Sequence, residues 1–253
     1  MLNDTSRLVR EQAHYALDGL AQYCATLPAT DTSRARFVAG LCQQLAVKGP
    51  EETTAFILTL LQTCPDEQAL PALQPLLSFE HFADPAAAVL EVIGSAQSAQ
   101  QLLDELPNVP DGQKVILLNH LAGMRVSKAE PLLLNMAEHK HSGIKRAALS
   151  ALAELPGRQA ETILKQYPDQ TLYLRYISRL IATNDKQRAA QRCREILKDA
   201  GKAAQHGSAL SLLVQADGVA ALPELQKTVA DGAADIAAKA LLLVETLNSK
   251  REL

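Results

Sequence analysis

The sequence contains no tryptophan, and aromatic residues make up only 4% of its 253 residues. Valine and isoleucine are also scarce, at 12 and 9 residues, whereas leucine and alanine number 42 and 41. Strands favour β-branched and aromatic side chains, while helices favour leucine and alanine. This composition excludes a β-sandwich, a β-barrel and a parallel α/β sheet, and it predicts an all-α protein.

Long apolar runs are missing as well. The longest, such as residues 115–118 and 240–244, are far shorter than the roughly 18 residues that a membrane-spanning helix needs, so no membrane is expected as a partner. The first residues lack the basic and apolar segments of a signal peptide. We therefore expect a cytoplasmic protein if Met1 is the natural start, and a periplasmic or secreted one if the sequence is a fragment of a larger protein.

Only four cysteines are present, Cys24, Cys42, Cys64 and Cys193, separated by 18, 22 and 129 residues. None belongs to a C-x-x-C pair or to a cluster with histidine, which excludes a structural zinc site and a disulfide framework. Unpaired cysteines of this kind behave as small apolar side chains. We predict four free and mostly buried thiols.

Strong charge of one sign is also lacking, because the net charge is only −3. Residues 1–100 hold 5 basic and 11 acidic side chains, whereas residues 140–200 hold 12 basic and 6 acidic ones. The excess of basic residues in 140–200 is smaller than the excess typical of a nucleic-acid-binding domain. Nucleic acid is therefore not the expected partner.

What the sequence does contain is a repeat. Apolar residues recur at helical spacing in eight segments that begin near Val9, Thr54, Ala87, Val115, Ile144, Leu172, Ala204 and Ile236. After a first step of 45 residues, the steps between these starts are 28 to 33 residues. This is the length of two short helices and two turns, and it predicts a repeated helix pair.

A second type of helix lies between these segments and carries proline near its start, at Pro71, Pro131 and Pro223. Proline is tolerated there because the first turn of a helix has no partner for its N–H groups. Asp84 and Pro85 similarly predict an N-cap followed by proline at the first helical position.

The pattern A-x-P-x-L-x-x-L, a turn, and V-R-x-x-A-x-x-A-L-x-x-L is similar to HEAT repeats, in particular the short HEAT-like subclass. Residues 129–155 carry both halves in order, and residues 69–93 and 220–244 match more weakly. The resemblance implies an all-α, right-handed α-α superhelix, a HEAT-like solenoid of about seven helix pairs. It implies a single array over residues 1–253 or a fragment of a longer multidomain protein, since similar arrays often accompany other domains of large bacterial proteins.

In such a solenoid, neighbouring pairs stack because one pair cannot bury both of its faces. Alanines such as Ala13, Ala16 and Ala147 are expected to face neighbouring helices and to let them approach closely.

Enzymes with HEAT-like repeats carry residue patterns that can be looked for in this sequence. Deoxyhypusine hydroxylases need His-Glu pairs for two irons, whereas this sequence has only the reverse order, at Glu80–His81 and Glu138–His139. We interpret these histidines and His141 as surface or capping residues. The sequence also lacks a glycine-rich phosphate loop and a G-x-S-x-G motif. No catalytic residue, metal ligand or cofactor is predicted, and we do not expect an enzyme.

HEAT-like DNA glycosylases combine a basic groove with aromatic residues, typically tryptophan, against the damaged base. Here Tyr167, Tyr173 and Tyr176 lie among the basic residues of the region 165–198. Basic residues interleaved with aromatic ones suit nucleic acid. In the other interpretation, Tyr173 belongs to a buried stripe, and the arginines pair with Asp169, Asp185, Glu195 and Asp199.

The leading hypothesis is a non-enzymatic scaffold that binds another protein, or another domain of its parent chain, through the concave face of the solenoid. The second helix of each HEAT-like pair lines that face, here the helices that begin near Val9, Val115, Ile144 and Leu172, so their outward polar residues are the candidates. A basic residue after the first apolar one, such as Arg10, can instead pair within the array. The alternative function is nucleic-acid binding or DNA-base processing through residues 165–198. The candidate binding residues are Arg10, Lys114, His120, Arg146, Arg175 and Arg179, together with His14 and Lys145.

Overall fold

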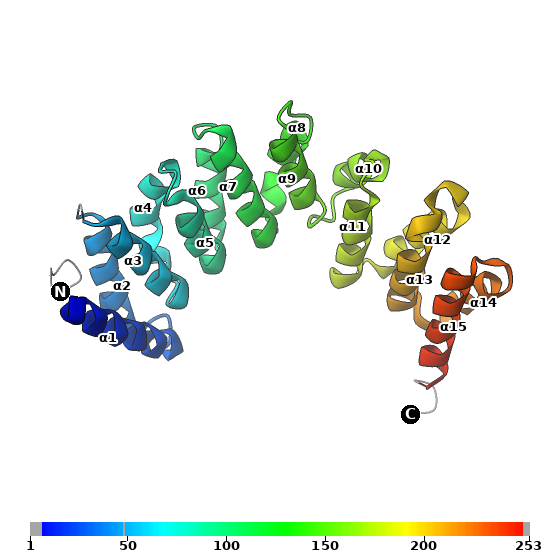
Figure 1. The fold of residues 1–253 in the computed structure, drawn as a ribbon, viewed down its shortest axis with the longest axis horizontal. Coiled ribbons are helices and arrows are strands. Elements are labelled where there is room, and N and C mark those ends of the chain that lie inside the picture. The colour runs from blue at the N-terminus through cyan, green and yellow to red at the C-terminus, as the bar shows by residue number, and fades with distance from the viewer. Residues whose placement is uncertain (1–6, 48, 250–253) are drawn as a thin grey trace. The chain divides into compact units, whose positions relative to one another are not determined.

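The structure, a computed structural model, describes residues 7–47 and 49–249, and none of these residues lies in a strand (Figure 1). The predicted all-α class is confirmed. The chain divides into two compact units, residues 1–151 and residues 152–253. None of the described helices is long and apolar enough to cross a membrane.

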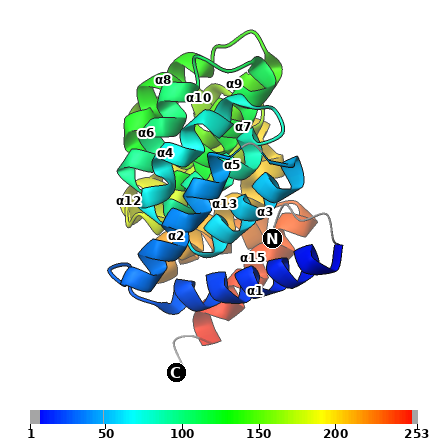
Figure 2. The same cartoon turned by 90° about the vertical axis from the view of Figure 1, so that its left-hand side faces the viewer.

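In the first unit, odd-numbered helices contact one another in sequence: α1 contacts α3, α3 contacts α5, and α5 contacts α7. Even-numbered helices lie beside them, so that α2 contacts α1 and α3, and α6 contacts α5 and α7. Figure 2 shows α2, α4 and α6 along one side and α3, α5 and α7 along the other. The helices of this unit are α1 (Arg7–Thr26), α2 (Thr32–Leu45), α3 (Glu51–Thr63), α4 (Leu70–Leu73), α5 (Ala83–Ile93), α6 (Ala96–Glu105), α7 (Asp111–Met124), α8 (Glu130–Met136) and α9 (Ser142–Leu152), which ends at the boundary.

The second unit follows the same scheme. Helix α11 contacts α13, and α13 contacts α15, while α12 packs against both α11 and α13 and α14 packs against α15. The helices of this unit are α10 (Arg158–Gln166), α11 (Gln170–Ala182), α12 (Lys186–Lys198), α13 (Ala203–Asp217), α14 (Leu222–Asp231) and α15 (Ala234–Ser249).

The predicted helix starts agree with the structure. Each of the eight odd-numbered helices begins within about one helical turn of its predicted start. Pro71, Pro131 and Pro223 lie in the first turns of α4, α8 and α14, as predicted, and a short 3₁₀ turn precedes each of these helices. Local signals, namely apolar periodicity and proline, were sufficient to place these elements.

The prediction of Asp84 as an N-cap is wrong. Helix α5 begins at Ala83, with Phe82 as its N-cap, so Asp84 and Pro85 lie inside the first turn. The cause is the preceding turn, because the backbone N–H groups of Phe82 and Ala83 both donate to the carbonyl oxygen of Phe79 and lead directly into the helix. The carboxylate of Asp84 is thereby left for a different contact, described below.

Alanine and leucine form the buried layers, as expected. Ala13 and Ala147 are buried, and in α5 the side chains of Ala87 and Leu90 are fully buried. Ala16 is an exception, because its side chain is exposed on α1. The periodicity therefore located α1 without showing which of its sides contacts the neighbouring helix.

The histidines before α9 have the predicted capping role. The Nδ1 atom of His139 accepts a hydrogen bond from the backbone N–H of His141 at 3.1 Å. The Nδ1 atom of His141 accepts one from the backbone N–H of Ile144 at 3.4 Å. These contacts satisfy backbone donors at a helix start, which otherwise lack partners.

All four cysteines are free thiols; Cys24, Cys64 and Cys193 are buried and Cys42 is partly exposed. Burial raises the pKa of Cys193 to about 12. Burial also raises the pKa of the other three thiols above the ordinary value. The prediction of free, mostly buried cysteines is confirmed.

We expect one thiol of the folded protein, Cys42, to react faster with an aromatic disulfide reagent at pH 8 than the other three, because only its side chain has solvent access. Unfolding in guanidinium chloride should release all four. Changing Cys42 to serine should remove the fast phase, whereas Cys193→Ser should not. Prompt reaction of two or more thiols in the folded wild type would contradict the burial pattern.

Candidate binding site

The structure places the candidate residues of the first unit in different settings. Arg10 is half-buried on α1, and Arg146 is exposed on α9. The Nζ atom of Lys114 lies 3.3 Å from Oδ1 of Asp111, one turn earlier on α7. Lys114 and His120 share α7, but six residues separate them and their side chains leave the helix about 120° apart. These four residues therefore do not form one continuous row.

His120 joins two helices. Its Nδ1 lies 2.6 Å from Oε2 of Glu91, and its Nε2 lies 3.1 Å from Oδ1 of Asp84, both on α5. A Cβ atom at Gly123 would lie 1.8 Å from Oε1 of Glu91, so glycine at that position leaves room for the carboxylate. With a side chain only 16% exposed, His120 links α7 to α5 and offers little surface to a partner.

Three further candidates lie on α1 and α11. His14 stacks on Phe56 of α3, with ring centroids 3.9 Å apart, so its ring contributes to helix packing. Arg175 and Arg179 lie one turn apart on α11, where Arg175 is exposed and Arg179 is half-buried. Among the described residues, Nε of Arg179 has no hydrogen-bond partner.

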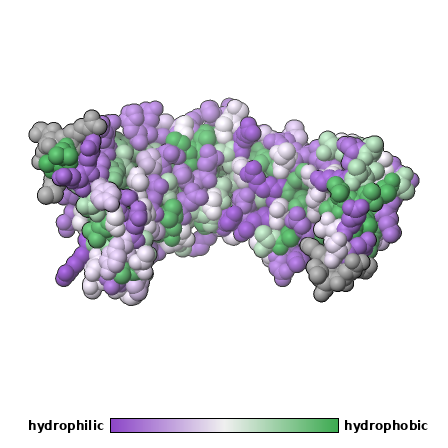
Figure 3. Space-filling view, turned by 60° about the horizontal axis from the view of Figure 1, so that its bottom comes forward, coloured by the Kyte–Doolittle hydropathy of each residue, from purple (hydrophilic) through white to green (hydrophobic). Residues whose placement is uncertain are grey.

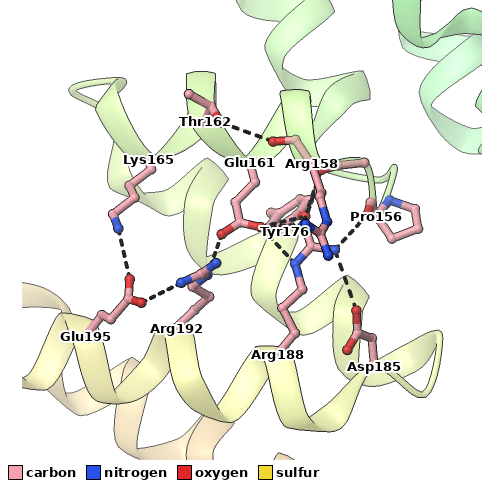
Figure 4. Close-up of polar contacts among 11 residues, drawn as sticks. Pro156, Arg158, Glu161, Thr162, Lys165, Tyr176, Asp185, Arg188, Arg192 and Glu195 are labelled. Carbon is pink, nitrogen blue, oxygen red and sulfur yellow. Dashed lines mark hydrogen bonds and ion pairs between the residues drawn. The ribbon is translucent and has the colours of Figure 1, made fainter.

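The densest group of charges lies between α10 and α12, in the second unit (Figure 4). Glu161 of α10 is only 7% exposed, although it is ionisable. Its Oε2 accepts a hydrogen bond from Nε of Arg188 at 2.8 Å, and its Oε1 pairs with Arg192. The hydroxyl of Tyr176, from α11, donates to the carbonyl oxygen of Gly157 at 2.8 Å. We call Glu161, Tyr176, Arg188, Arg192 and Glu195 the Glu161 cluster.

The electrostatics of the Glu161 cluster keep its arginines and Glu195 charged. Burial opposes the charge on Arg188 and Arg192, but their contacts with Glu161 and other neighbours, Asp185 for Arg188 and Glu195 for Arg192, together outweigh it and raise the pKa of both guanidinium groups. Burial likewise opposes ionisation of Glu195, yet hydrogen bonds from Lys165 and Arg192 outweigh it and lower the pKa of this carboxyl. Burial raises the pKa of Tyr176. These shifts move the pKa of each group further from neutral pH. Such pKa values suit an ion-pair network better than proton transfer.

A cavity of about 590 Å³ opens beside the Glu161 cluster. Its other polar lining residues include Arg158, Thr162, Gln187 and Gln191. The guanidinium groups of Arg188 and Arg192 that border it are already bound to Glu161. Within the described ranges, no group of three or more His, Cys, Asp or Glu side chains is arranged to hold a metal ion.

The basic region 165–198 is largely occupied by internal contacts. Lys165 pairs with Glu195 at 2.9 Å, and Arg194 pairs with Asp217 at 2.6 Å and Glu224 at 2.5 Å. The rings of Tyr173 and Tyr176 are 1% and 0% exposed, so bases cannot stack on them without a rearrangement. This geometry agrees with the interpretation of a buried tyrosine stripe and paired arginines.

Sequence reasoning missed part of the charge pairing. It named Asp185 and Glu195, but not Glu161, Asp217 and Glu224, which lie on neighbouring helices. The burial of Glu161 could have been predicted from its position. It follows the apolar Ala160 and precedes Leu164 by three residues, so it lies in the stripe of α10 that is buried.

Sequence reasoning also missed an uncovered apolar surface on α1. The side chains of Tyr15, Leu8 and Tyr23 are 86%, 63% and 59% exposed. Spacings of seven and eight residues place them on one side of the helix, and Gln12 and Gly19 lie between them. We call Leu8, Gln12, Tyr15, Gly19 and Tyr23 the α1 outer face; it contains no charged residue.

Smaller apolar surfaces occur elsewhere. Leu241 and Leu242 of α15 are 49% and 63% exposed. In Figure 3 the visible surface is mostly polar, and apolar side chains gather at the right-hand end, over the C-terminal helices. Single exposed apolar residues are common on soluble proteins, whereas the α1 outer face extends over four turns of one helix.

Comparisons with known proteins identify no family for this chain. No protein-family model matches it, and a comparison with curated proteins found no similar sequence.

Proposed function

We propose that the chain is a non-enzymatic protein-binding module with the architecture of a HEAT-like α-solenoid. Contacts between successive odd-numbered helices, in both units, support the solenoid. The regular helix starts and the prolines that open α4, α8 and α14 support its HEAT-like character. Repeat proteins of this kind serve mainly as binding surfaces, because most of their residues are used for stacking.

The α1 outer face is the observation that carries the proposal. Tyrosine is enriched in the centres of protein interfaces, where its ring adds apolar area and its hydroxyl can still reach a hydrogen-bond partner. Surface helices normally carry charged residues on the side away from the core. The α1 outer face exposes Leu8, Tyr15 and Tyr23 and carries no charge. It is therefore suited to binding another protein.

The edges of this surface favour a partner of one kind. Glu11 and Asp18 border the α1 outer face along one edge, and residues 1–100 carry six more acidic than basic side chains, 11 against 5. An amphipathic helix with apolar side chains on one face and basic residues along one edge complements this surface. Such a helix comes from another protein or from another domain of the same parent chain.

The site is tested by photo-crosslinking in the native host, with a photoreactive residue in place of Tyr15. One defined adduct is expected, and the double variant Leu8→Ser/Tyr23→Ser should reduce its yield at least tenfold, since a few central aromatic and aliphatic residues dominate interface energy. The same photoreactive residue at Gln43, exposed on α2, is the matched control and should not give this adduct.

Stability measurements separate loss of binding from loss of folding. Because Leu8 and Tyr23 are exposed, the midpoint of urea unfolding of the double variant should equal that of the wild type. An adduct that persists in the double variant would contradict the proposal, as would an equal adduct at Gln43.

Nucleic-acid binding through residues 165–198 has less support, since Tyr173 and Tyr176 are buried and the main arginines are paired. A salt-titrated binding assay with DNA and RNA compares the two functions. Binding that retains submicromolar affinity at physiological salt would favour nucleic acid over protein.

A further inference from the structure

An apolar pocket of about 320 Å³ lies in the first unit, where the end of α2 meets the start of α3 and the segment that joins α4 to α5. None of the described residues that line it is charged. Its volume is at the lower end of the roughly 300–1,000 Å³ that small-molecule sites occupy, so it has room for one or two side chains of a partner. We call this space the Phe79 pocket; its apolar walls include Leu45, Val47, Leu76, Phe79 and Phe82.

Two side chains of the Phe79 pocket remain largely in solvent. Phe79 is 58% exposed and Val47 is 54% exposed. The backbone at Phe79 is nevertheless fixed, because its carbonyl oxygen accepts hydrogen bonds from the N–H groups of Phe82 at 3.0 Å and Ala83 at 2.8 Å. A phenylalanine ring on a fixed backbone loses little freedom when a partner covers it, so its burial favours binding at a low entropic cost.

The surface around the Phe79 pocket is acidic. Residues 37–113 contain ten acidic side chains and only one lysine or arginine, Lys48. Glu51 and Glu52 open α3, and Glu80 lies in the segment that joins α4 to α5; all three are exposed. The same two elements supply walls of the pocket. Negative charge therefore lies beside an uncharged, apolar interior.

A fourth carboxylate, that of Glu105 in α6, is held at the same place by a hydrogen bond. Its Oε1 accepts from the hydroxyl of Ser78 at 2.7 Å, and Ser78 directly precedes Phe79. In the ranges 7–47 and 49–249, no Lys, Arg or His forms an ion pair with Glu105 or with the three exposed glutamates. These four charges are thus not neutralised within the described part of the chain, and they favour a positively charged partner.

We propose that the Phe79 pocket binds a short peptide segment of another protein, which inserts one large apolar side chain and carries lysine or arginine on both sides of it. The apolar walls select the inserted side chain, because burial of a polar one among them is unfavourable. The glutamates select its basic neighbours and disfavour acidic ones. This inference goes beyond the α1 outer face and does not depend on it.

The probe is a short fluorescent peptide in a glycine and serine background, with a central leucine and arginines on both sides of it. Its binding to the full chain is followed by fluorescence anisotropy at physiological ionic strength. Two comparison peptides carry serine in place of the leucine or glutamates in place of the arginines. Saturable binding of the first peptide is expected, and each comparison peptide should bind at least tenfold more weakly, because the anchor and the flanking charges are both required.

Variants of the pocket test its apolar walls. Phe79→Ser should weaken binding of the leucine peptide at least tenfold, and Val47→Ser at least threefold, because both side chains would be covered by the peptide. Val92→Ser is the matched control for Val47, since Val92 is 52% exposed on α5 outside the pocket and should bind like the wild type. All three side chains are exposed, so each variant should keep the wild-type melting temperature.

Variants of the rim test the charges. Glu51→Gln/Glu80→Gln should weaken binding of the leucine peptide and make the affinity less sensitive to salt, because fewer charges then attract the arginines. Glu138→Gln/Glu245→Gln removes two exposed carboxylates outside residues 37–113, and it should retain the wild-type affinity and salt dependence.

Several outcomes would overturn the proposal. One is the absence of saturable binding by the wild type, and another is equal binding of the leucine and serine peptides, which would leave only charge attraction. Equal binding of the glutamate peptide would identify a neutral apolar ligand instead. Full binding by Phe79→Ser together with loss of binding in Leu8→Ser/Tyr23→Ser would place the peptide on the α1 outer face. That last result would support the proposed function while contradicting this inference.

Discussion

Replacing Glu161 with alanine is expected to lower the free energy of unfolding of the second unit by about 3 kcal/mol, at the low end of the cost of removing one partner from a buried ion pair. The side chain of Glu161 is 9% exposed, and its carboxylate pairs with both Arg188 and Arg192, so its loss leaves two guanidinium groups without their main partner. The value stays at the low end because the arginine side chains are 17% and 23% exposed and water can reach them in part. Urea denaturation followed by circular dichroism measures the change.

Two controls define the cause of this loss. Glu161→Gln keeps the size of the side chain and one acceptor oxygen, so it should lose less than the alanine variant. Asp111→Ala removes a carboxylate that is 48% exposed and pairs with Lys114, and the expected loss is below about 0.5 kcal/mol. A loss below about 1 kcal/mol for Glu161→Ala would show that the cluster contributes little to stability.

Changing Leu90 to alanine is expected to destabilise the first unit by about 3 kcal/mol, the typical cost of a large-to-small change in a closed core. Leu90 is 0% exposed in α5, and α5 contacts both α3 and α7. The cavity would therefore form in a closed part of a helix that packs against two others. Chemical denaturation gives the size of the loss, and amide hydrogen exchange shows where it occurs.

Exchange should accelerate in α5 and in α3 and α7, because α5 contacts both of these helices. Leu242→Ala is the matched control: the same substitution at a side chain that is 63% exposed should cost less than about 0.5 kcal/mol. If both variants lost similar amounts of stability, the burial assigned to α5 would be incorrect.

The helices themselves were predictable from the sequence because their signals are local. Apolar spacing located α3 and α13 to within about one turn, and proline placed the start of α8. The cysteines were expected to be buried because none has a second cysteine or a histidine close to it in the sequence. Such cysteines behave as small apolar side chains. The start of α5 was misplaced because a backbone turn at Phe79, which carries no sequence signature of its own, decides it.

The candidate sites were less predictable because their contacts join different helices. Charge counts showed that residues 140–200 are basic, but not that Arg188 meets Glu161, 27 residues away. His120 was predicted to point outward, whereas contacts with Asp84 and Glu91 hold it between α7 and α5. These pairings depend on the rotation of each helix against its neighbour, which a sequence period of 3.6 residues does not specify.

Three of the polar side-chain contacts between helices have nearly the same separation along the chain. Glu91 and His120 are 29 residues apart, Lys165 and Glu195 are 30 apart, and Arg194 and Glu224 are 30 apart. Each helix pair therefore presents charges that fit the pair before or after it, and exchanging two pairs would bring mismatched charges together. A chain that grew by duplication of one helix pair could thus have acquired a fixed order of its copies by changing only a few charged residues in each.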